Sequence, residues 1–378
     1  MQELAPVSPE RNPNSHTSAE VLDALRGKSG SRMLTFRYEL LSSANVKLLD
    51  LDNVLSGSVE QNWLADIKRK AKFTIQDTGV INFLSDRIKP YARLHLPPWG
   101  AEDWVEWPQG VFLPASPTRH ADETDTVIRE VEGYDPLQVF LDDKTASRYI
   151  VYANTLYTTG ISDALGSIPK SITVSTAVLP VTKEWEPGTS KLTIINDLLG
   201  AINYESLSFD EDGMAIVQPY AAPSARAEEY TYADDQDSVM LPNVDQELDL
   251  FNIPNKWVLT VSEPDRDPIR VAYINTDPAS PTSTVRRGRT ITDSRVGVEA
   301  ADLAALTEMV ERLAFEASQI YEAVEFETSI MPIHSGNDVY RITYSTLAVD
   351  AKYSEHTWSM PLVVGGVMKH RARRVVTI

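Results

Sequence analysis

Acidic residues beside aromatic ones are the first candidates for chemistry in this sequence of 378 residues. Asp103 and Glu106 lie next to Trp99, Trp104 and Trp107, and two converging carboxylates are the usual machinery of glycoside cleavage. However, the stretch from 87 to 113 alternates apolar and polar residues around a Pro-Pro-Trp-Gly turn, which predicts a hairpin with a wide loop. We therefore expect the rings to pack on a barrel or on a partner.

A second acidic group lies at Asp210, Asp212 and Gly213 and suggests a calcium loop. Such a loop needs an oxygen ligand at position five, where this chain has Met214, and a Glu at position twelve, which is missing. Asp-Gly adopts the positive φ of a tight hairpin turn. The segment is therefore predicted to be a turn between two apolar strands.

The metal and nucleophile inventory is small. The six histidines are at positions 16, 95, 120, 334, 356 and 370, without His-x-x-x-His or HExxH spacing, so a metal site would need distant residues to meet. The absence of cysteine excludes disulfides, thiolate nucleophiles and iron–sulfur clusters. No P-loop, dinucleotide or Gly-x-Ser-x-Gly motif occurs. We predict no catalytic, cofactor-binding or metal residue, and no enzyme activity.

The net charge of −19 argues against a protein that binds nucleic acid by neutralising phosphates. Three short basic stretches could still meet nucleic acid, but we favour solvated strand edges or contacts to acidic neighbouring subunits. These stretches are Lys68-Arg69-Lys70, Arg286-Arg287 with Arg289, and Lys369-His370-Arg371 with Arg373-Arg374.

The chain begins with a polar, proline-rich arm over residues 1–17, which we expect to be mobile unless a neighbour orders it. Ser18 is a plausible N-cap of a short helix that ends at Gly27. Leu34, Phe36 and Tyr38 alternate with polar residues, which predicts a half-buried strand, and further strands are expected near Val59, at 73–75 and over 126–132.

The middle of the chain changes character. Thr189 is expected to cap a helix with an apolar stripe, and the acidic stretch 221–249 is expected to be an exposed excursion. Strand patterning returns at Trp257, a long helix is expected from Glu299 to about Tyr321, and three strands close the chain.

These patterns predict a mainly β fold with an α+β insert, in which two small β-barrel-like domains flank a mixed middle domain. The expected segments are an N-terminal arm with a short helix (1–32), a first β-barrel domain (33–145), an α+β middle domain (146–250), and a second β-barrel domain that contains the long helix (251–378). No signal peptide or membrane-spanning segment is evident, so we expect the chain to be made and assembled in the cytosol, or to leave it only by lysis.

Two regions of the chain resemble a known family. The N-terminal region has "LDALRG", "GSV" and "FTIQD", and the C-terminal region has "IMPIH", "NDVYRI" and "WSM", in this order. The chain resembles the minor tail proteins of long-tailed phages of actinobacteria, specifically the tail-tip or baseplate hub proteins. The resemblance implies a homotrimer whose subunits each supply two similar β-barrels, and it implies no catalytic residues.

The expected function is therefore that of a structural virion protein, a baseplate hub that closes the tail tube. The implied partners are two further copies, the distal tail or tail tube protein, the tape-measure protein, and tail-fibre or tip proteins. DNA would only be in transit during genome ejection, and no cofactor is expected. The alternatives are a receptor- or carbohydrate-binding module built on exposed Trp99, Trp104 and Trp107, and a tail-associated hydrolase.

Overall fold

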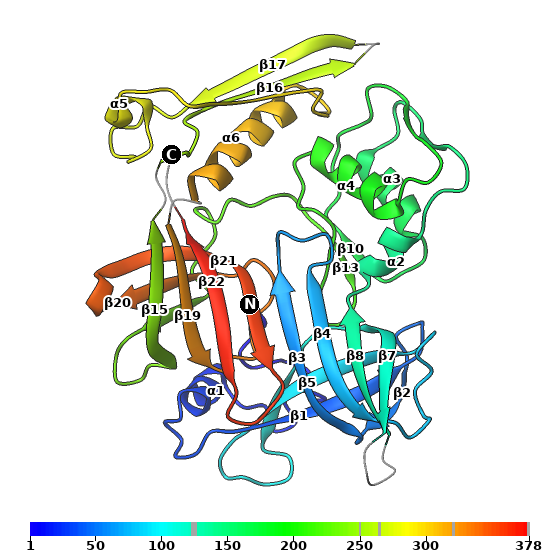
Figure 1. Ribbon diagram of the computed structural model, residues 1–378, viewed down its shortest axis with the longest axis vertical. Helices are drawn as coiled ribbons and strands as arrows, with labels where there is room; N and C mark the ends of the chain where they lie inside the picture. Colours follow the sequence, from blue (N-terminus) through cyan, green and yellow to red (C-terminus); the bar gives the residue numbers. More distant parts are fainter. Residues whose placement is uncertain (122–126, 249–250, 264–265, 320–321, 376–378) are drawn as a thin grey trace.

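The computed structural model describes residues 1–378 except 122–126, 249–250, 264–265, 320–321 and 376–378. A long sheet crosses the lower part of the molecule in Figure 1, and each pair of neighbouring strands along its main path is antiparallel. The path runs β15 (Met240–Leu248), β19 (Glu322–Ser329), β22 (Val367–Arg374), β21 (Val349–Pro361), β3 (Val54–Asn62), β4 (Arg69–Gln76), β8 (Val127–Tyr134) and β7 (Leu113–Ala121).

This sheet joins the two β-rich ends of the chain. Its first four strands come from the C-terminal part and its last four from the N-terminal part. The junction is the pairing of β21 with β3, from Thr357 opposite Asn62 to Pro361 opposite Ser58. Trp63 N–H extends the contact by donating to the carbonyl of His356, at 2.8 Å. The two halves are therefore parts of one continuous sheet.

A second sheet covers one face of the N-terminal half. It has the order β2 (Lys47–Leu51), β1 (Met33–Leu41), β5 (Arg87–His95) and β6 (Trp104–Pro108). Tyr38 on β1 meets Phe73 on β4 edge to face, with 6.2 Å between ring centroids. The strand predicted from the alternation of Leu34, Phe36 and Tyr38 is confirmed.

The short N-terminal helix, α1 (Ser18–Leu25), begins one residue earlier than predicted. Thr17, not Ser18, is the N-cap, and it forms a capping box with Glu20. The side chain of Glu20 accepts from Thr17 N–H while Thr17 Oγ1 accepts from Glu20 N–H, which satisfies two helix-end donors.

The expectation that residues 1–17 are mobile is wrong. Gln2 N–H donates to the carbonyl of Ile333 at 2.7 Å, and Trp107 Nε1–H donates to the carbonyl of Glu3 at 2.8 Å. Farther along, Glu106 N–H donates to the carbonyl of Arg11 at 3.0 Å. The arm is ordered because its backbone is bound by distant parts of its own chain, which composition alone does not reveal.

The predicted α+β insert is present, with its own apolar core around α4. Its helix α4 (Lys191–Ala201) is capped by Ser190, whose hydroxyl accepts from Thr193 N–H, and not by Thr189. The predicted Asp-Gly hairpin is also present, between β12 (Ser208–Phe209) and β13 (Ala215–Val217). The other elements are α2 (Leu137–Asp142), β9 (Tyr149–Val151), α3 (Tyr157–Leu165), β10 (Lys170–Ile172) and β11 (Lys183–Trp185).

The acidic stretch 221–249 is not the exposed excursion that its composition suggested. It supplies β15, one end of the long sheet, and β14 (Tyr230–Ala233), which pairs in parallel with β20 (Val339–Tyr344). Tyr230 and Tyr232 are buried, and the rings of Tyr232 and Tyr340 meet edge to face. Both β14 and β15 therefore belong to the same sheet as β19, β20, β21 and β22.

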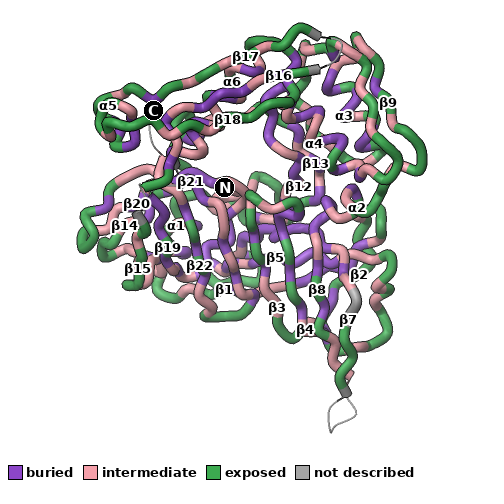
Figure 2. Tube along the Cα trace, turned by 45° about the horizontal axis from the view of Figure 1, so that its top comes forward, coloured by how far each residue is buried: buried purple, intermediate pink, exposed green. Residues whose placement is uncertain are grey.

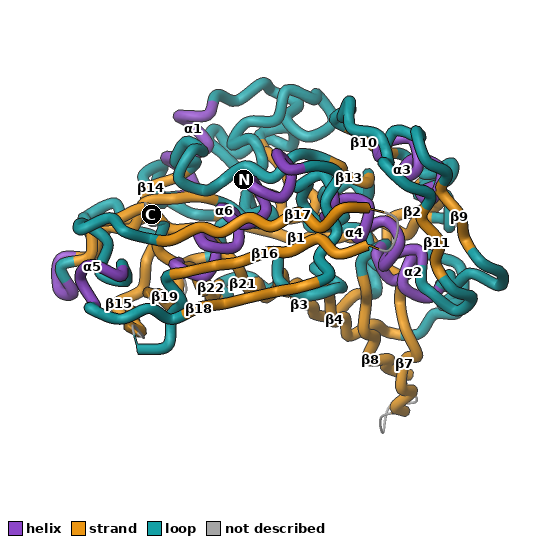
Figure 3. Tube along the Cα trace, turned by 90° about the horizontal axis from the view of Figure 1, so that it is seen from above, coloured by secondary structure: helices purple, strands orange, loops and turns teal. Residues whose placement is uncertain are grey.

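A third unit lies above the long sheet in Figure 1 and is seen from above in Figure 3. It consists of β16 (Lys256–Glu263), β17 (Arg266–Ile274) and β18 (Thr292–Val296), packed on the long helix α6 (Leu303–Gln319). Trp257, Leu306 and Val310 belong to its core. The helix starts later than the expected Glu299, and Tyr321, its expected end, is outside the described residues.

Figure 2 shows the buried residues following these units, along the long sheet, around α4 and along α6. The remaining short helices are α5 (Thr284–Arg287) and the 3-10 turn η1 (Ser345–Leu347). The mainly β class with an α+β insert is confirmed. The finer domain limits stay a prediction. Among the described residues, no helix has the length and apolar character needed to span a membrane.

Candidate functional sites: buried polar clusters and free sheet edges

The carboxylates of the aromatic hairpin do not converge. Glu106 is buried and accepts from two arginines, Arg37 and Arg93. Asp103 instead accepts from Asn14 at 2.6 Å and from Gly100 N–H at 2.9 Å. The two acids are engaged in separate structural contacts, so the structure gives no support to a hydrolase built on this pair.

The three tryptophans do not form an exposed platform. Trp107 is fully buried, and the guanidinium of Arg93 lies 3.8 Å from the centroid of the Trp104 ring. Only Trp99 is strongly exposed, at 41% of its surface. The sugar-binding alternative required several exposed rings, and it loses its main support here.

The Asp-Gly turn binds its own chain. Asp210 Oδ1 accepts from the N–H groups of Asp212 and Met214, at 3.0 and 2.8 Å. Asp212 Oδ1 accepts from Lys89 at 2.6 Å and is also bonded to Arg11 of the N-terminal arm. The turn therefore fastens the insert to β5 and to the arm, which is a structural role.

The three basic stretches are mostly paired within the chain. Arg69 is buried and donates to Gln61 and Glu211, at 2.9 and 2.6 Å. Arg287 donates to backbone carbonyls, and Arg371 lies 3.4 Å from Glu247 and Glu325. These contacts favour the structural interpretation of the basic stretches over nucleic-acid binding.

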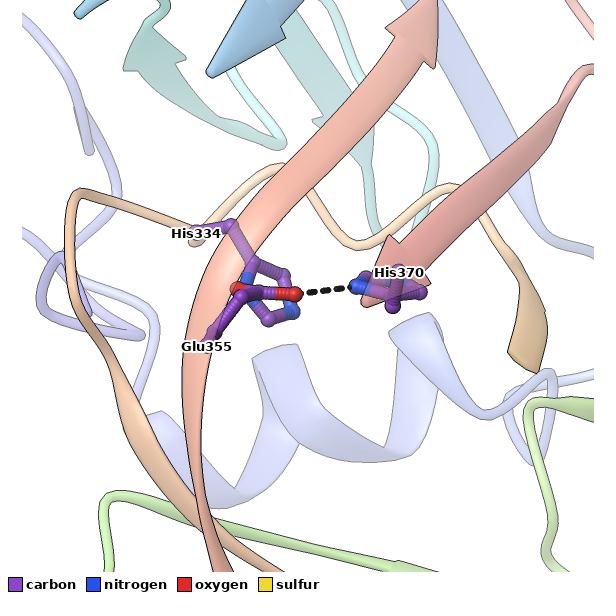
Figure 4. Close-up of side chains that lie close together, drawn as sticks. All are labelled: His334, Glu355 and His370. Carbon is purple, nitrogen blue, oxygen red and sulfur yellow. Dashed lines mark hydrogen bonds and ion pairs between the residues drawn. The ribbon is translucent and has the colours of Figure 1, made fainter. Parts of the chain in front are cut away.

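Distant histidines do meet inside the C-terminal half of the sheet, which sequence spacing did not predict. His334 from the loop before β20, Glu355 on β21 and His370 on β22 lie together in the core (Figure 4). His370 Nδ1 and His334 Nδ1 lie 2.6 Å from the two oxygens of Glu355. We call these three residues the histidine cluster.

The outer nitrogens of the histidine cluster are also occupied. His334 Nε2 lies 2.6 Å from the hydroxyl of Tyr232, and His370 Nε2 lies 2.9 Å from the hydroxyl of Thr328. His334 Nδ1 is also 3.0 Å from Asp338. Two imidazoles and a carboxylate are a donor set that zinc accepts. Because each nitrogen already has a hydrogen-bond partner at normal length, we interpret the cluster as a hydrogen-bond network.

Charge within the histidine cluster is unevenly distributed. Burial alone would lower the pKa of His334, but the carboxylates of Glu355 and Asp338 outweigh it and raise this pKa to about 9. Burial lowers the pKa of His370, against the pull of Glu355. His334 is therefore the protonated histidine of the cluster, and its imidazolium forms a buried ion pair with Glu355.

The ends of the long sheet are candidate assembly surfaces. Each of the strands β7 and β15 has a single partner strand in the described part of the chain. Each also has an irregular start, with a register shift and a proline, Pro114 in β7 and Pro242 in β15. Regular pairing resumes over residues 118–121 and 244–248. An edge strand has unpaired backbone N–H and C=O groups, so it can template pairing with another chain.

No protein-family model matches the chain, and no curated protein matches it in sequence. Solved structures do match. The tail protein from Neisseria meningitidis MC58 is 11% identical with a TM-score of 0.65, over 90% of this chain and 97% of that one. The 43 kDa tail protein of prophage MuSo2 from Shewanella oneidensis is 10% identical with a TM-score of 0.62, over 90% and 98%. Prophage tail protein gp18 from Listeria monocytogenes EGD-e is 10% identical with a TM-score of 0.54, over 89% and 94%.

This chain has the fold of those tail proteins. The likeness covers 90% of this chain in both cases, so it extends well beyond the long sheet. It agrees with the family resemblance in the sequence at the level of fold.

Proposed function

We propose that this chain is a structural phage tail protein of the tail tip, a baseplate hub that forms a homotrimeric ring and closes the tail tube. The observation that carries the proposal is the eight-strand path, whose first and last strands each have one partner strand among the described residues. The fold shared with tail proteins supports the same conclusion, and so does the engagement of the candidate catalytic carboxylates in structural contacts.

The strand directions suit a closed ring. Because each of the seven neighbouring pairs along the path is antiparallel, β15 and β7 run in opposite directions. Rotation about a ring axis keeps the direction of each strand along that axis. The β7 edge of one copy would thus meet the β15 edge of the next in antiparallel register, and the alternation would continue without a break.

The number of halves suits a sixfold tube. Along the main path of the ten-stranded sheet, one chain supplies two sets of four strands, so three chains supply six sets and 3 × 8 = 24 strands. At about 4.8 Å between strands, 24 strands form a backbone cylinder about 37 Å across, and subtracting side chains leaves roughly 25 Å. Strand tilt widens this further. Such a lumen would admit the tape-measure protein and then a DNA duplex.

The charges of the open sheet face suit passage. The face away from the core has opposite charges across neighbouring strands. The pairs are Glu60–Lys70, Lys72–Glu132, Glu325–Arg371 and Glu327–Lys369. With this face as the wall, the lumen carries alternating charge along its surface. A lysine or arginine that lies opposite a glutamate on the next strand attracts DNA phosphates less than a basic surface without nearby carboxylates would.

The remaining partners follow from the same arrangement. In a ring of this kind, one rim meets the distal tail or tail tube protein and the other meets tail-fibre or tip proteins. In Figure 1 the insert and the α6 unit both lie above the upper ends of the strands of the long sheet. One rim of the ring would therefore have a surface different from that of the other rim. The expected location is the phage virion, after assembly in the host cytoplasm.

Two neighbouring proline substitutions in β15 test the edge-to-edge ring. In an antiparallel ladder, successive residues direct their N–H groups to opposite sides, so one of Asp245 and Gln246 faces β19 and the other faces the free edge. Both Asp245→Pro and Gln246→Pro remove an N–H. We expect one variant to lose thermal stability, and the other to keep its stability but lose the trimer in light scattering. If neither variant changes the oligomeric state, the proposed edge contact is wrong.

A further inference from the structure

A cavity of ≈ 380 Å³ lies where the two halves of the sheet, the insert and α6 meet. Trp63 and Lys68 line it from the β3–β4 turn, Glu205 and Ser206 from the insert, and Arg312 and Glu316 from α6. His356 of β21 and Arg373 of β22 complete the wall. Neither the fold nor the hub proposal gives this cavity a role.

His356 has an unusual position at a β-bulge. The register of β21 against β22 shifts between Glu355 and Thr357, so His356 is the extra residue of the strand. Bulges re-aim side chains and are frequent beside functional sites. Both ring nitrogens are shielded from solvent, yet neither has a hydrogen-bond partner among the described residues. Buried polar groups without partners are rare in native proteins.

Arg373 is the second polar group without a partner. The two other arginines near it on β22 form ion pairs, Arg371 with Glu247 and Glu325, and Arg374 with Glu322. No hydrogen bond or ion pair engages the guanidinium of Arg373 in the described part of the chain. Burial lowers its pKa, the charge of Arg371 adds to this effect, and the charge of Glu316 opposes it. A half-buried arginine keeps five donors in a fixed fork that matches an oxyanion.

The acids around the cavity are already engaged. Glu316 accepts from Arg312 Nε at 2.9 Å, and Glu205 lies 3.7 Å from the same guanidinium. Lys68 donates to the carbonyl of Trp63 and to Ser206 Oγ, both at 2.9 Å, and burial lowers its pKa to about 8. Asp66 is exposed, and Arg295 is 3.0 Å from Asp293. The carboxylates that line the cavity therefore do not serve as hydrogen-bond acceptors for Arg373 or His356.

We propose that this cavity is an oxyanion site that takes one carboxylate, with the guanidinium of Arg373 as a bidentate donor and the imidazole of His356 as a second donor. Glu205 and Glu316 also line the cavity, so a monoanion meets less repulsion there than a phosphate dianion would. The inference does not depend on the hub function. The carboxylate could be a free small acid or an acidic side chain of a second copy, and the experiment separates the two.

The test follows the ring nitrogens of His356 by NMR in the full-length protein labelled with ¹⁵N-histidine. His356→Asn assigns the signal. The structure predicts that acetate shifts this signal with a roughly millimolar dissociation constant, whereas neutral methyl acetate does not. Bound acetate should also raise the pKa of His356, which burial and Arg373 otherwise lower to about 3. A purely structural histidine would show neither response.

Arg373→Gln should weaken acetate binding about 10-fold or more, because a charge-assisted pair to Arg is lost. The matched control is Lys369→Gln, which removes an exposed cation four residues before Arg373 on β22. This variant should leave the affinity for acetate unchanged. A shift that appears when protein concentration alone is raised would identify a carboxylate of a second copy. A His356 signal that ignores both acetate and protein concentration overturns the proposal, as does equal affinity in the Arg373 variant.

Discussion

His334→Gln should remove a specific pH dependence of stability. The folded pKa of His334 is about 9, against an ordinary value of 6.5, because Glu355 and Asp338 outweigh the effect of burial. A raised pKa means that the folded state binds the proton more tightly than the unfolded state. The stabilisation is therefore complete below pH 6.5 and is lost as the pH rises through 9.

The magnitude follows from the shift. One pKa unit corresponds to about 1.4 kcal/mol, so the full effect is about 3 kcal/mol, of which about 2 kcal/mol disappears between pH 6 and pH 8. This window avoids Lys68, whose lowered pKa of about 8 gives a contribution of opposite sign between pH 8 and its ordinary value. Glutamine cannot take up the proton but keeps a polar amide in the site, which limits the structural disturbance.

The assay is urea unfolding at pH 6, 7 and 8, with the free energy of unfolding extrapolated to water. The wild type should lose about 2 kcal/mol more than His334→Gln over this range. His120→Gln, at an exposed position on β7, is the matched control and should follow the wild type. Parallel pH profiles for wild type and His334→Gln would refute the assignment of a buried, proton-linked ion pair to this cluster.

Three further predictions concern stability. Trp358→Ala should lower the free energy of unfolding by about 3–5 kcal/mol, because Trp358 is buried at the junction of the two halves. Trp99→Ala, on the surface, should lower it by less than about 1 kcal/mol. Similar losses in the two variants would contradict the assigned core. Gly336→Ala should cost about 1–3 kcal/mol, since its Cβ would lie 2.4 Å from the Trp63 ring, whereas Gly200→Ala meets open space in α4 and should stabilise by about 0.5–1 kcal/mol. EDTA should leave the melting temperature unchanged if the histidine cluster is a hydrogen-bond network, and a clear drop would instead indicate a bound metal.

Local patterns predicted local structure well. The alternation of Leu34, Phe36 and Tyr38 predicted β1, and Asp-Gly at 212–213 predicted the hairpin turn. The starts of α1 and α4 were displaced by one residue, because Thr17 and Ser190 each have a neighbouring Ser or Thr that could cap equally well. The side chain that bonds to the first turn is decided by backbone geometry, which composition does not show.

Features that depend on distant partners were missed. The parallel partner of β14 is β20, more than a hundred residues away, and the surrounding acidic composition concealed the strand. The alternation in Tyr230-Thr231-Tyr232-Ala233 was a usable signal for it. The N-terminal arm was misjudged for the same reason, since its backbone is ordered by residues near positions 107 and 333.

The histidine cluster and the cavity could also not be predicted from the sequence. His334, Glu355 and His370 meet only because the pairing register of β21 and β22 brings two strands and a loop together. His356 lies in the next position but faces the cavity because the strand bulges there. A pattern of period two predicts the face of a regular strand and fails at a bulge.

The mass of the purified protein in solution, measured by light scattering over a range of concentrations, tests the central claim most directly. A trimeric ring predicts three chains of 42.1 kDa, about 126 kDa, and loss of that species in the edge-facing proline variant of β15. A single species of 42.1 kDa at every concentration, alike in the wild type and in both proline variants, would contradict a ring closed by its own sheet edges.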